Sequence, residues 1–235
     1  MTSVEEVLEQ LEARAQPDQL EGMAKFGLAG EKRLGVRVPA MRKIAKKIGR
    51  DHQLALDLWQ TGIAEAMMVA SMIDIPEAVT GAQMEAWVQD FNAWDICDQV
   101  CMNLFDKTPL AWQKVHDWAA REEEFVKRAA FALIACLAWH NKEAADEAFI
   151  DLLPLIKAGA TDERNYVKKG VSWALRHIGK RNPRLNEVAL QAADELHKMD
   201  SKSARWIGHD VVRDLTSETT RRRLSKQRSS GNESS

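Results

Sequence analysis

The sequence predicts an all-α fold, arranged as a solenoid of about six helix pairs. Three observations support this prediction. Helix-start signals and apolar residues at helical spacing recur along almost the whole chain. Strand signals are sparse, because the chain has one tyrosine, few β-branched runs and no Asn-Gly turn. A short sequence pattern also recurs at intervals of about 40 residues.

The composition is that of a globular protein with enough apolar residues for a sizeable core. Of the 235 residues, 45% are hydrophobic, and no apolar run approaches the roughly 20 residues of a membrane span. The acidic, amphipathic N-terminus does not read as a signal peptide. Cys97, Cys101 and Cys136 are odd in number and lack CxxC spacing, so we expect no disulfide framework, no zinc site and a reducing cytoplasm.

Charge is segregated along the chain, although the formal net charge is only −2. Residues 32–50 contain eight basic and no acidic residues, and residues 164–184 contain seven basic and no acidic residues. The C-terminus adds Arg221, Arg222, Arg223, Lys226 and Arg228, whereas the first 21 residues are acidic. This pattern predicts a positive face on a nearly neutral protein, unless each run is only a solvated helix face.

Capping signals position the helices of the N-terminal half. Ser3 and Glu6 form a capping box for a first helix, and Pro17 begins a second that ends near Gly27 and Gly30. Pro39 begins an amphipathic helix whose outer face is cationic. Further helices are predicted at 54–58, at 65–73, from Thr80, around Trp94 and Asp98, and from Thr108-Pro109.

The C-terminal half continues the helical pattern. Helices are predicted at about 122–139, 142–157, 163–179, 183–198 and 202–215. We therefore expect a single domain over residues 1–216. A basic, serine-rich and flexible tail is expected over residues 217–235.

A repeat links the helices of this half. The segment Phe125-Val126-Lys127-Arg128-Ala129-Ala130 is similar to Tyr166-Val167-Lys168-Lys169-Gly170-Val171, which begins 41 positions later. A similar pattern occurs again at residues 204–208, where Arg205 aligns with Lys169, which lies 36 positions earlier. Such periods are typical of HEAT or armadillo repeats, in which one helix of each pair lines a concave surface.

Two helical faces on this expected surface carry informative residues. Trp94 and Asp98 are four apart, so a π-face lies beside a carboxylate, which suits a ligand with developing positive charge. The alternative is a core tryptophan beside a solvated or capping aspartate. Trp173 shares a face with the cations Lys169, Arg176 and Lys180. The alternative there is a tryptophan packed against the next repeat under arginine stems.

These segments resemble the AlkD-type DNA alkylation repair glycosylases. The resemblance rests on Trp94–Asp98, Val126–Ala130 and Tyr166–Arg176 with the following Lys180-Arg181-Asn182-Pro183, and extends from Gly35 to about residue 215. It implies an all-helical HEAT-like enzyme that hydrolyses the N-glycosidic bond of cationic alkylpurines, such as 3-methyladenine and 7-methylguanine, without flipping the base out of the duplex.

The resemblance also implies roles for individual residues. Trp94 and Trp173 would hold the backbone of the damaged nucleotide, Asp98 would act on the sugar, and Arg128 would reach a phosphate. The cations expected to contact DNA are Arg42, Lys43, Lys46, Lys47, Lys127, Lys168, Lys169, Arg176 and Lys180. Ala93 stands where a family member carries a second tryptophan.

The chemistry agrees with these residue types. An N-alkylated purine is already cationic and leaves without a proton, so the enzyme must stabilise the oxocarbenium-like sugar, which a carboxylate can do. We expect no metal or redox cofactor. The expected partner is double-stranded DNA carrying alkylated purines, bound by a cytoplasmic monomer with no membrane association. The alternative function is a non-catalytic helical-repeat module that binds DNA or a protein on the same face.

Overall fold

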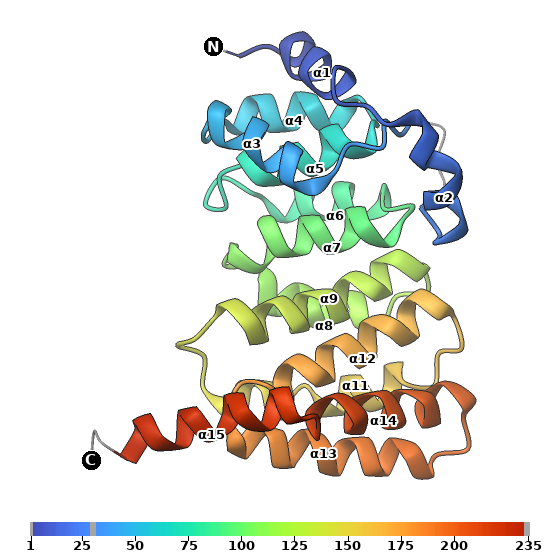
Figure 1. The fold of residues 1–235 in the computed structure, drawn as a ribbon, viewed down its shortest axis with the longest axis vertical. Coiled ribbons are helices and arrows are strands. Elements are labelled where there is room, and N and C mark those ends of the chain that lie inside the picture. Colours follow the sequence, from blue (N-terminus) through green and yellow to red (C-terminus); the bar gives the residue numbers. More distant parts are fainter. Residues whose placement is uncertain (1, 29–31, 233–235) are drawn as a thin grey trace. The chain divides into compact units, whose positions relative to one another are not determined.

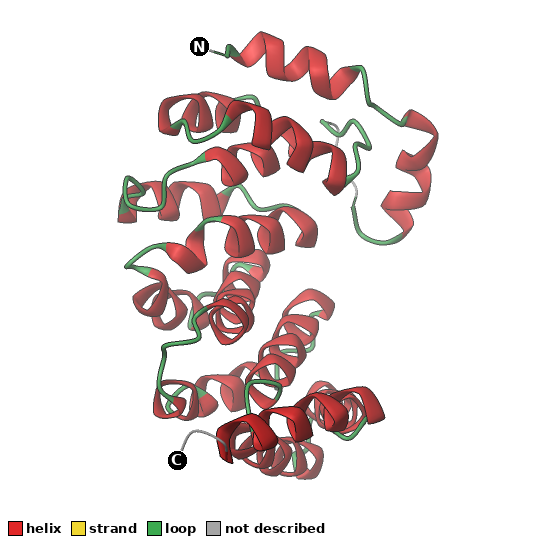
Figure 2. Ribbon diagram, turned by 60° about the vertical axis from the view of Figure 1, so that its left-hand side comes forward, coloured by secondary structure: helices red, strands yellow, loops and turns green. Residues whose placement is uncertain are grey.

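The structure is a computed structural model that describes residues 2–28 and 32–232, the last six of them as backbone only. Over these residues it consists of helices and loops without any strand (Figures 1 and 2). The prediction of an all-α fold is confirmed. The chain divides into two compact units, Met1–Ala111 and Trp112–Ser235, which are described one at a time.

Unit 1 begins with a capped helix. The capping box predicted at Ser3 and Glu6 is present at the start of α1, and Gly30, where the second helix was expected to end, lies outside the described residues. The helices of unit 1 are α1 (Val4–Glu12), α2 (Leu20–Lys25), α3 (Val38–Ile48), α4 (His52–Gln60), α5 (Ala64–Ile73), α6 (Gly81–Gln89) and α7 (Trp94–Asn103), with 3₁₀ turns η1 (Pro17–Gln19) and η2 (Phe105–Lys107).

Helix α5 is the centre of unit 1. Every residue from 64 to 71 is buried, and the helix packs against α3, α4 and α7. A helix that is apolar on all sides is suited to such a position. Between α4 and α6, the rings of Trp59 and Trp87 stack with 3.9 Å between their centroids. This core holds α3 and α7, which carry the predicted functional residues of the unit.

Unit 2 follows the same design with longer helices. Its elements are α8 (Ala111–Ala119, which begins at the boundary), α9 (Glu124–His140), α10 (Asp146–Ile150), α11 (Leu153–Gly159), α12 (Asn165–Gly179), α13 (Pro183–Lys198), α14 (Lys202–Leu215) and α15 (Glu218–Asn232). Helix α12 packs against α9, α13 and α14. Figure 1 shows α9, α12 and α14 running in the same direction across the unit.

The repeat detected in the sequence corresponds to contacts between these parallel helices. The rings of Phe125 and Tyr166, which are 41 positions apart in the sequence comparison, stack with 5.4 Å between centroids. Between α12 and α14 the Ser172 hydroxyl donates to Asp210 Oδ2 at 2.6 Å, a separation of 38 residues.

Two predicted boundaries differ from the structure for local reasons. The helix expected at 142–157 is two helices, α10 and α11, because Pro154 can occupy only the first turn of a helix. The helix expected from Thr108-Pro109 begins at Ala111. The Thr108 hydroxyl is occupied elsewhere, since it donates to the Phe105 carbonyl at 2.9 Å.

The segment expected to be a flexible tail instead continues as α15. The Ser217 hydroxyl accepts the Thr220 backbone N–H at 3.3 Å, which starts the helix. Thr220 and Leu224 are four residues apart and only 4% and 7% exposed, because this helix packs against α13 and α14. The described helices include none with the length and apolarity needed to cross a membrane.

Candidate functional site

Helix α7 carries the tryptophan–carboxylate pair that the sequence singled out. Trp94 is its first residue and Asp98 lies one turn later, and both are half-buried. Their spacing directs both side chains to one side of the helix. Ala93 occupies the N-cap position in extended conformation and has no side chain that could cap the helix.

The indole of Trp94 is held by the preceding part of the chain. Its Nε1–H donates to the Phe26 carbonyl at 2.9 Å. Phe26 directly follows α2, and its side chain is 74% exposed. The orientation of Trp94 is thus linked to the position of α2.

A buried ion pair anchors the start of α7. The two guanidinium nitrogens Nη1 and Nη2 of Arg33 donate to the two carboxylate oxygens of Asp95, each at 2.7 Å. The side chains of Arg33 and Asp95 are 3% and 15% exposed. Such a bidentate arginine–carboxylate pair fixes the relative orientation of the two side chains and also neutralises their charges.

A second buried carboxylate holds the loop that carries Arg33. Glu65, 1% exposed on α5, accepts the backbone N–H groups of Leu34 and Gly35 at 3.0 and 2.8 Å. The sequence analysis missed Arg33, Asp95 and Glu65 as positioning residues. A glutamate within the apolar run of α5 was the available signal, since a buried carboxylate must be hydrogen-bonded.

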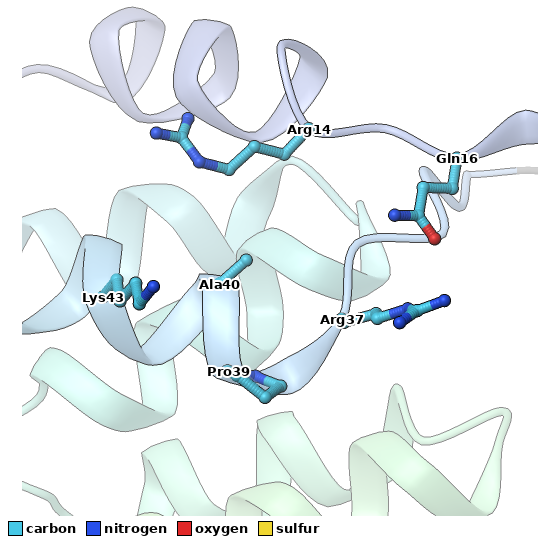
Figure 3. A pocket seen from close by; sticks show the side chains of 6 residues that line it. All are labelled: Arg14, Gln16, Arg37, Pro39, Ala40 and Lys43. Atoms are coloured by element: carbon cyan, nitrogen blue, oxygen red, sulfur yellow. The ribbon is translucent and has the colours of Figure 1, made fainter.

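Helix α3 presents the cations predicted for it. Met41, Ile44 and Ala45 are buried, whereas the basic residues of the helix are exposed: Arg42, Lys43, Lys46 and Lys47. A cavity of about 590 Å³ beside this helix is lined by Arg14, Gln16, Arg37, Pro39, Ala40 and Lys43 (Figure 3). A second, of about 320 Å³, is lined by Arg42, Ala45, Lys46, Gly49, Arg50 and Met72. Neither lining includes a carboxylate.

In unit 2, Arg128 is a buried residue. It is 5% exposed, and its Nη1–H donates to the Tyr166 carbonyl at 2.6 Å, which joins α9 to the start of α12. Trp173 of α12 is half-buried and meets His177 edge to face at 5.8 Å. Trp94 and Asp98 belong to unit 1, and Arg128 and Trp173 to unit 2, so the convergence of the four residues stays a prediction.

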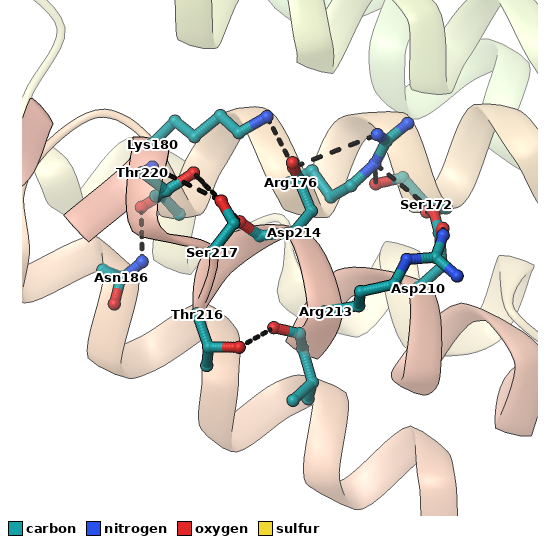
Figure 4. A network of polar contacts seen from close by, with 12 residues as sticks. Ser172, Arg176, Lys180, Asn186, Asp210, Arg213, Asp214, Thr216, Ser217 and Thr220 are labelled. Carbon is teal, nitrogen blue, oxygen red and sulfur yellow. Dashed lines mark hydrogen bonds and ion pairs between the residues drawn. The ribbon is translucent and has the colours of Figure 1, made fainter. Parts of the chain in front are cut away.

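Most of the other cations predicted in unit 2 already have acidic or aromatic partners. Arg176 Nε lies 3.5 Å from Asp210 Oδ2, and Lys180 Nζ lies 2.5 Å from Asp214 Oδ2 (Figure 4). Both carboxylates come from α14. Lys127 pairs with Asp162 at 3.5 Å, Lys168 lies 5.0 Å from the centroid of the Trp206 ring, and Lys169 is exposed. A phosphate that contacts Arg176 or Lys180 must therefore compete with α14.

His177 is held neutral within this network. Burial lowers the pKa of His177 from 6.5 to about 4, and the neighbouring Lys180 and Arg176 contribute to the shift. The imidazole therefore acts as an aromatic group at neutral pH. It contributes no positive charge to the surface.

Comparison with solved structures identifies the fold. One structure is described as a new family of proteins related to the HEAT-like repeat DNA glycosylases with affinity for branched DNA structures; it is 22% identical, with 90% of this chain and 95% of that chain covered and a TM-score of 0.76. The chain therefore has the HEAT-like helical-repeat fold, as predicted. A designed armadillo repeat protein is 17% identical over 91% of this chain and all of its own (100%), with a TM-score of 0.34.

The family comparison is more specific. Residues 7–206 match the family model described as DNA alkylation repair enzyme. The chain belongs to this DNA alkylation repair family, which confirms the resemblance found in the sequence. Comparison with curated proteins finds no match.

Proposed function

We propose that this protein is a DNA glycosylase that hydrolyses the N-glycosidic bond of cationic alkylpurines, such as 3-methyladenine and 7-methylguanine, in duplex DNA without base flipping. The observation that carries the proposal is the pair Trp94 and Asp98, one turn apart on a helix fixed by the Arg33–Asp95 ion pair. It acts as a cytoplasmic monomer and needs no cofactor.

The chemistry assigned to the pair follows from charge. The alkylated base leaves as a neutral purine, and positive charge develops on the sugar. The Asp98 carboxylate stabilises that charge and orients the attacking water, while the Trp94 ring adds a cation–π contribution on the order of 1 kcal/mol. A fixed helix terminus favours this role, because electrostatic stabilisation requires groups that are already in position.

Affinity for DNA is assigned to the exposed cations. Arg42, Lys43 and Lys46 of α3 line cavities without a carboxylate, so they are available to phosphates. Lys169 contributes from α12 in the same way. Trp173 and Arg128 keep the roles implied by the family, on the sugar-phosphate backbone of the lesion. The 5% exposure of Arg128 means that a phosphate contact requires a movement of its guanidinium away from the Tyr166 carbonyl.

A second candidate function is non-catalytic binding of branched DNA. The similar structure described above has such affinity. The burial of Arg128, the ion pairs of Arg176 and Lys180, and the alanine at position 93 favour this candidate. It predicts tighter binding of a four-way junction than of a linear duplex, and no released base.

The decisive experiment measures base release from a duplex that contains 7-methylguanine. We expect the wild-type protein to release the base, and Asp98→Asn to slow release by about 100-fold or more, the scale of losing one preorganised electrostatic group. Duplex affinity should persist or increase, because an anion has left the surface that binds a polyanion.

Asp57→Asn is the matched control, since Asp57 is an exposed carboxylate on α4 of the same unit. It should release base at the wild-type rate. A structural role for Asp98 would instead lower the melting temperature and reduce release only in proportion to the folded fraction. Release by Asp98→Asn at the wild-type rate would show that Asp98 is not the group that stabilises the sugar. No release by the wild-type protein together with tight junction binding would favour the second candidate.

A further inference from the structure

An aromatic row crosses the C-terminal ends of α9 and α12 in unit 2. It consists of Trp173, His177, Trp139 and His140. The ring centroids of successive members are 5.8, 5.9 and 4.8 Å apart, and the last two rings are stacked with an interplanar angle of 29°. The row therefore runs from Trp173, the tryptophan proposed to contact the lesion, to His140 at the C-terminal end of α9.

Trp139 is exposed where its helix is otherwise buried. Every residue of α9 from 128 to 138 is buried, whereas the Trp139 side chain is 43% exposed. Core packing accounts for the buried residues but gives no reason for a large aromatic ring in water at the end of the helix. His140 is also exposed. The row thus ends in a partly exposed tryptophan whose ring is stacked against His140.

The loop after Trp139 is rigidly held from α12. The Arg181 guanidinium donates to the carbonyls of Ala138, Asn141 and Ala144, at 3.0, 2.7 and 2.9 Å. It also lies 4.3 Å from the centroid of the Phe149 ring. These contacts fix the loop that carries Lys142, which begins directly after His140 at the end of α9. Binding a ligand on this platform would therefore cost little ordering of the protein.

Cations and carboxylates both lie near the row: Lys142 and Glu143 are exposed on the loop after α9. Burial lowers the pKa of Lys142, and the charges of Arg181 and Arg223 contribute in the same direction. Arg181 Nη2 also donates to the Lys142 carbonyl at 3.4 Å. Arg223 comes from α15, which continues from α14 towards the same end of the unit (Figure 1). The acid that acts on His177 from α14 is Asp214, and Lys180 pairs with it. An aromatic face among cations suits a nucleic-acid strand.

We propose that the aromatic row binds an unpaired nucleobase, stacked on Trp139, with Lys142 and Arg223 on the flanking phosphates. Every base has a π-face, so such a site selects unpaired nucleotides without reading sequence. It would recognise a strand that leaves the duplex at a bulge, gap or junction. The inference rests on the proposed binding of DNA and is independent of glycosidic bond cleavage.

The test compares two labelled duplexes by fluorescence anisotropy, one fully paired and one with a single extrahelical thymine. Trp139→Ala should weaken binding of the bulged duplex by about tenfold, the scale of one lost base–aromatic stack, and change binding of the paired duplex less than about twofold. Trp139→Phe should retain most of the preference. Lys142→Ala and Arg223→Ala should each reduce the salt slope for the bulged duplex by about one unit.

Trp206→Ala is the matched control, because Trp206 is a tryptophan of similar exposure, 40%, near the start of α14. It should leave the ratio of the two affinities unchanged. An equal effect of Trp139→Ala on both duplexes would overturn the proposal. A wild-type dimer that Trp139→Ala converts into a monomer would also overturn it, because the row would then be a self-association face. If the wild-type protein releases no base and Trp139→Ala loses the preference for the bulged duplex, the result supports the base-binding site and rejects the glycosylase.

Discussion

At the residue scale, the Arg33–Asp95 pair connects folding with the candidate site. Removing one member of a buried pair leaves an uncompensated charge, which costs about 3–5 kcal/mol. We therefore predict that Arg33→Ala lowers the unfolding free energy by about this amount in urea titrations. Arg33→Ala combined with Asp95→Ala should cost less than the sum of the two single changes, because no buried charge remains.

The control for this prediction is Arg42→Ala, which removes an exposed arginine of α3 in the same unit. Its effect on the unfolding free energy should stay within about 0.5 kcal/mol. A similarly small effect of Arg33→Ala would mean that the ion pair does not anchor α7, and the argument for a fixed Trp94 and Asp98 would be lost.

The stability of unit 2 depends on pH through His177, and the lowered pKa of this residue determines the direction of the change. The folded pKa is about 4 and the ordinary value is 6.5, so on acidification the unfolded chain takes up the proton first. The contribution of His177 to stability is therefore complete above about pH 6.5 and is lost as the pH falls towards 4. Between pH 7 and pH 5 we expect a loss of up to about 2 kcal/mol.

Urea unfolding of the wild type and of His177→Gln at the two pH values checks this. Glutamine does not titrate, so the variant should lose less stability than the wild type over the same interval, and the difference isolates His177 from the carboxylates. Parallel losses in the two proteins would show that His177 titrates with an ordinary pKa.

At the scale of elements, the close packing of α13 on α14 depends on Gly208. A Cβ atom at this position would lie 2.6 Å from the Ala193 carbonyl oxygen and 3.0 Å from the His197 backbone nitrogen. Backbone atoms of a helix cannot move aside as a side-chain end can, so the two helices would have to separate. We predict that Gly208→Ala lowers the unfolding free energy by about 1–3 kcal/mol, the usual cost of overpacking.

Gly22→Ala provides the opposite case. Gly22 lies within α2, and a Cβ atom at this position would have no neighbouring atom within 4 Å. Alanine should raise the unfolding free energy by about 0.5–1 kcal/mol through helix propensity. Thermal unfolding of both variants tests the assignment, and an increase in stability for Gly208→Ala would show that α13 and α14 do not approach as closely as described.

At the scale of the whole molecule, each unit has its own buried centre, α5 in unit 1 and α9 with α12 in unit 2. The cations divide between the units in different ways. On α3, Arg42, Lys43 and Lys46 line cavities without carboxylates, whereas Arg176 and Lys180 of unit 2 are engaged by α14. The two basic runs, which look alike in the sequence, therefore differ in the charge that they offer to DNA.

The sequence by itself determined the helical class, most helix boundaries and the repeat, because capping residues, prolines and apolar spacing act over a few positions along the chain. It also indicated the family, through the resemblance of the segments 94–98, 126–130 and 166–176, and the family model matches residues 7–206. Only the tertiary structure decided which polar and charged groups are paired. Arg33 meets Asp95 across 62 positions and Ser172 meets Asp210 across 38, and such partners depend on how helices pack, which local spacing does not encode.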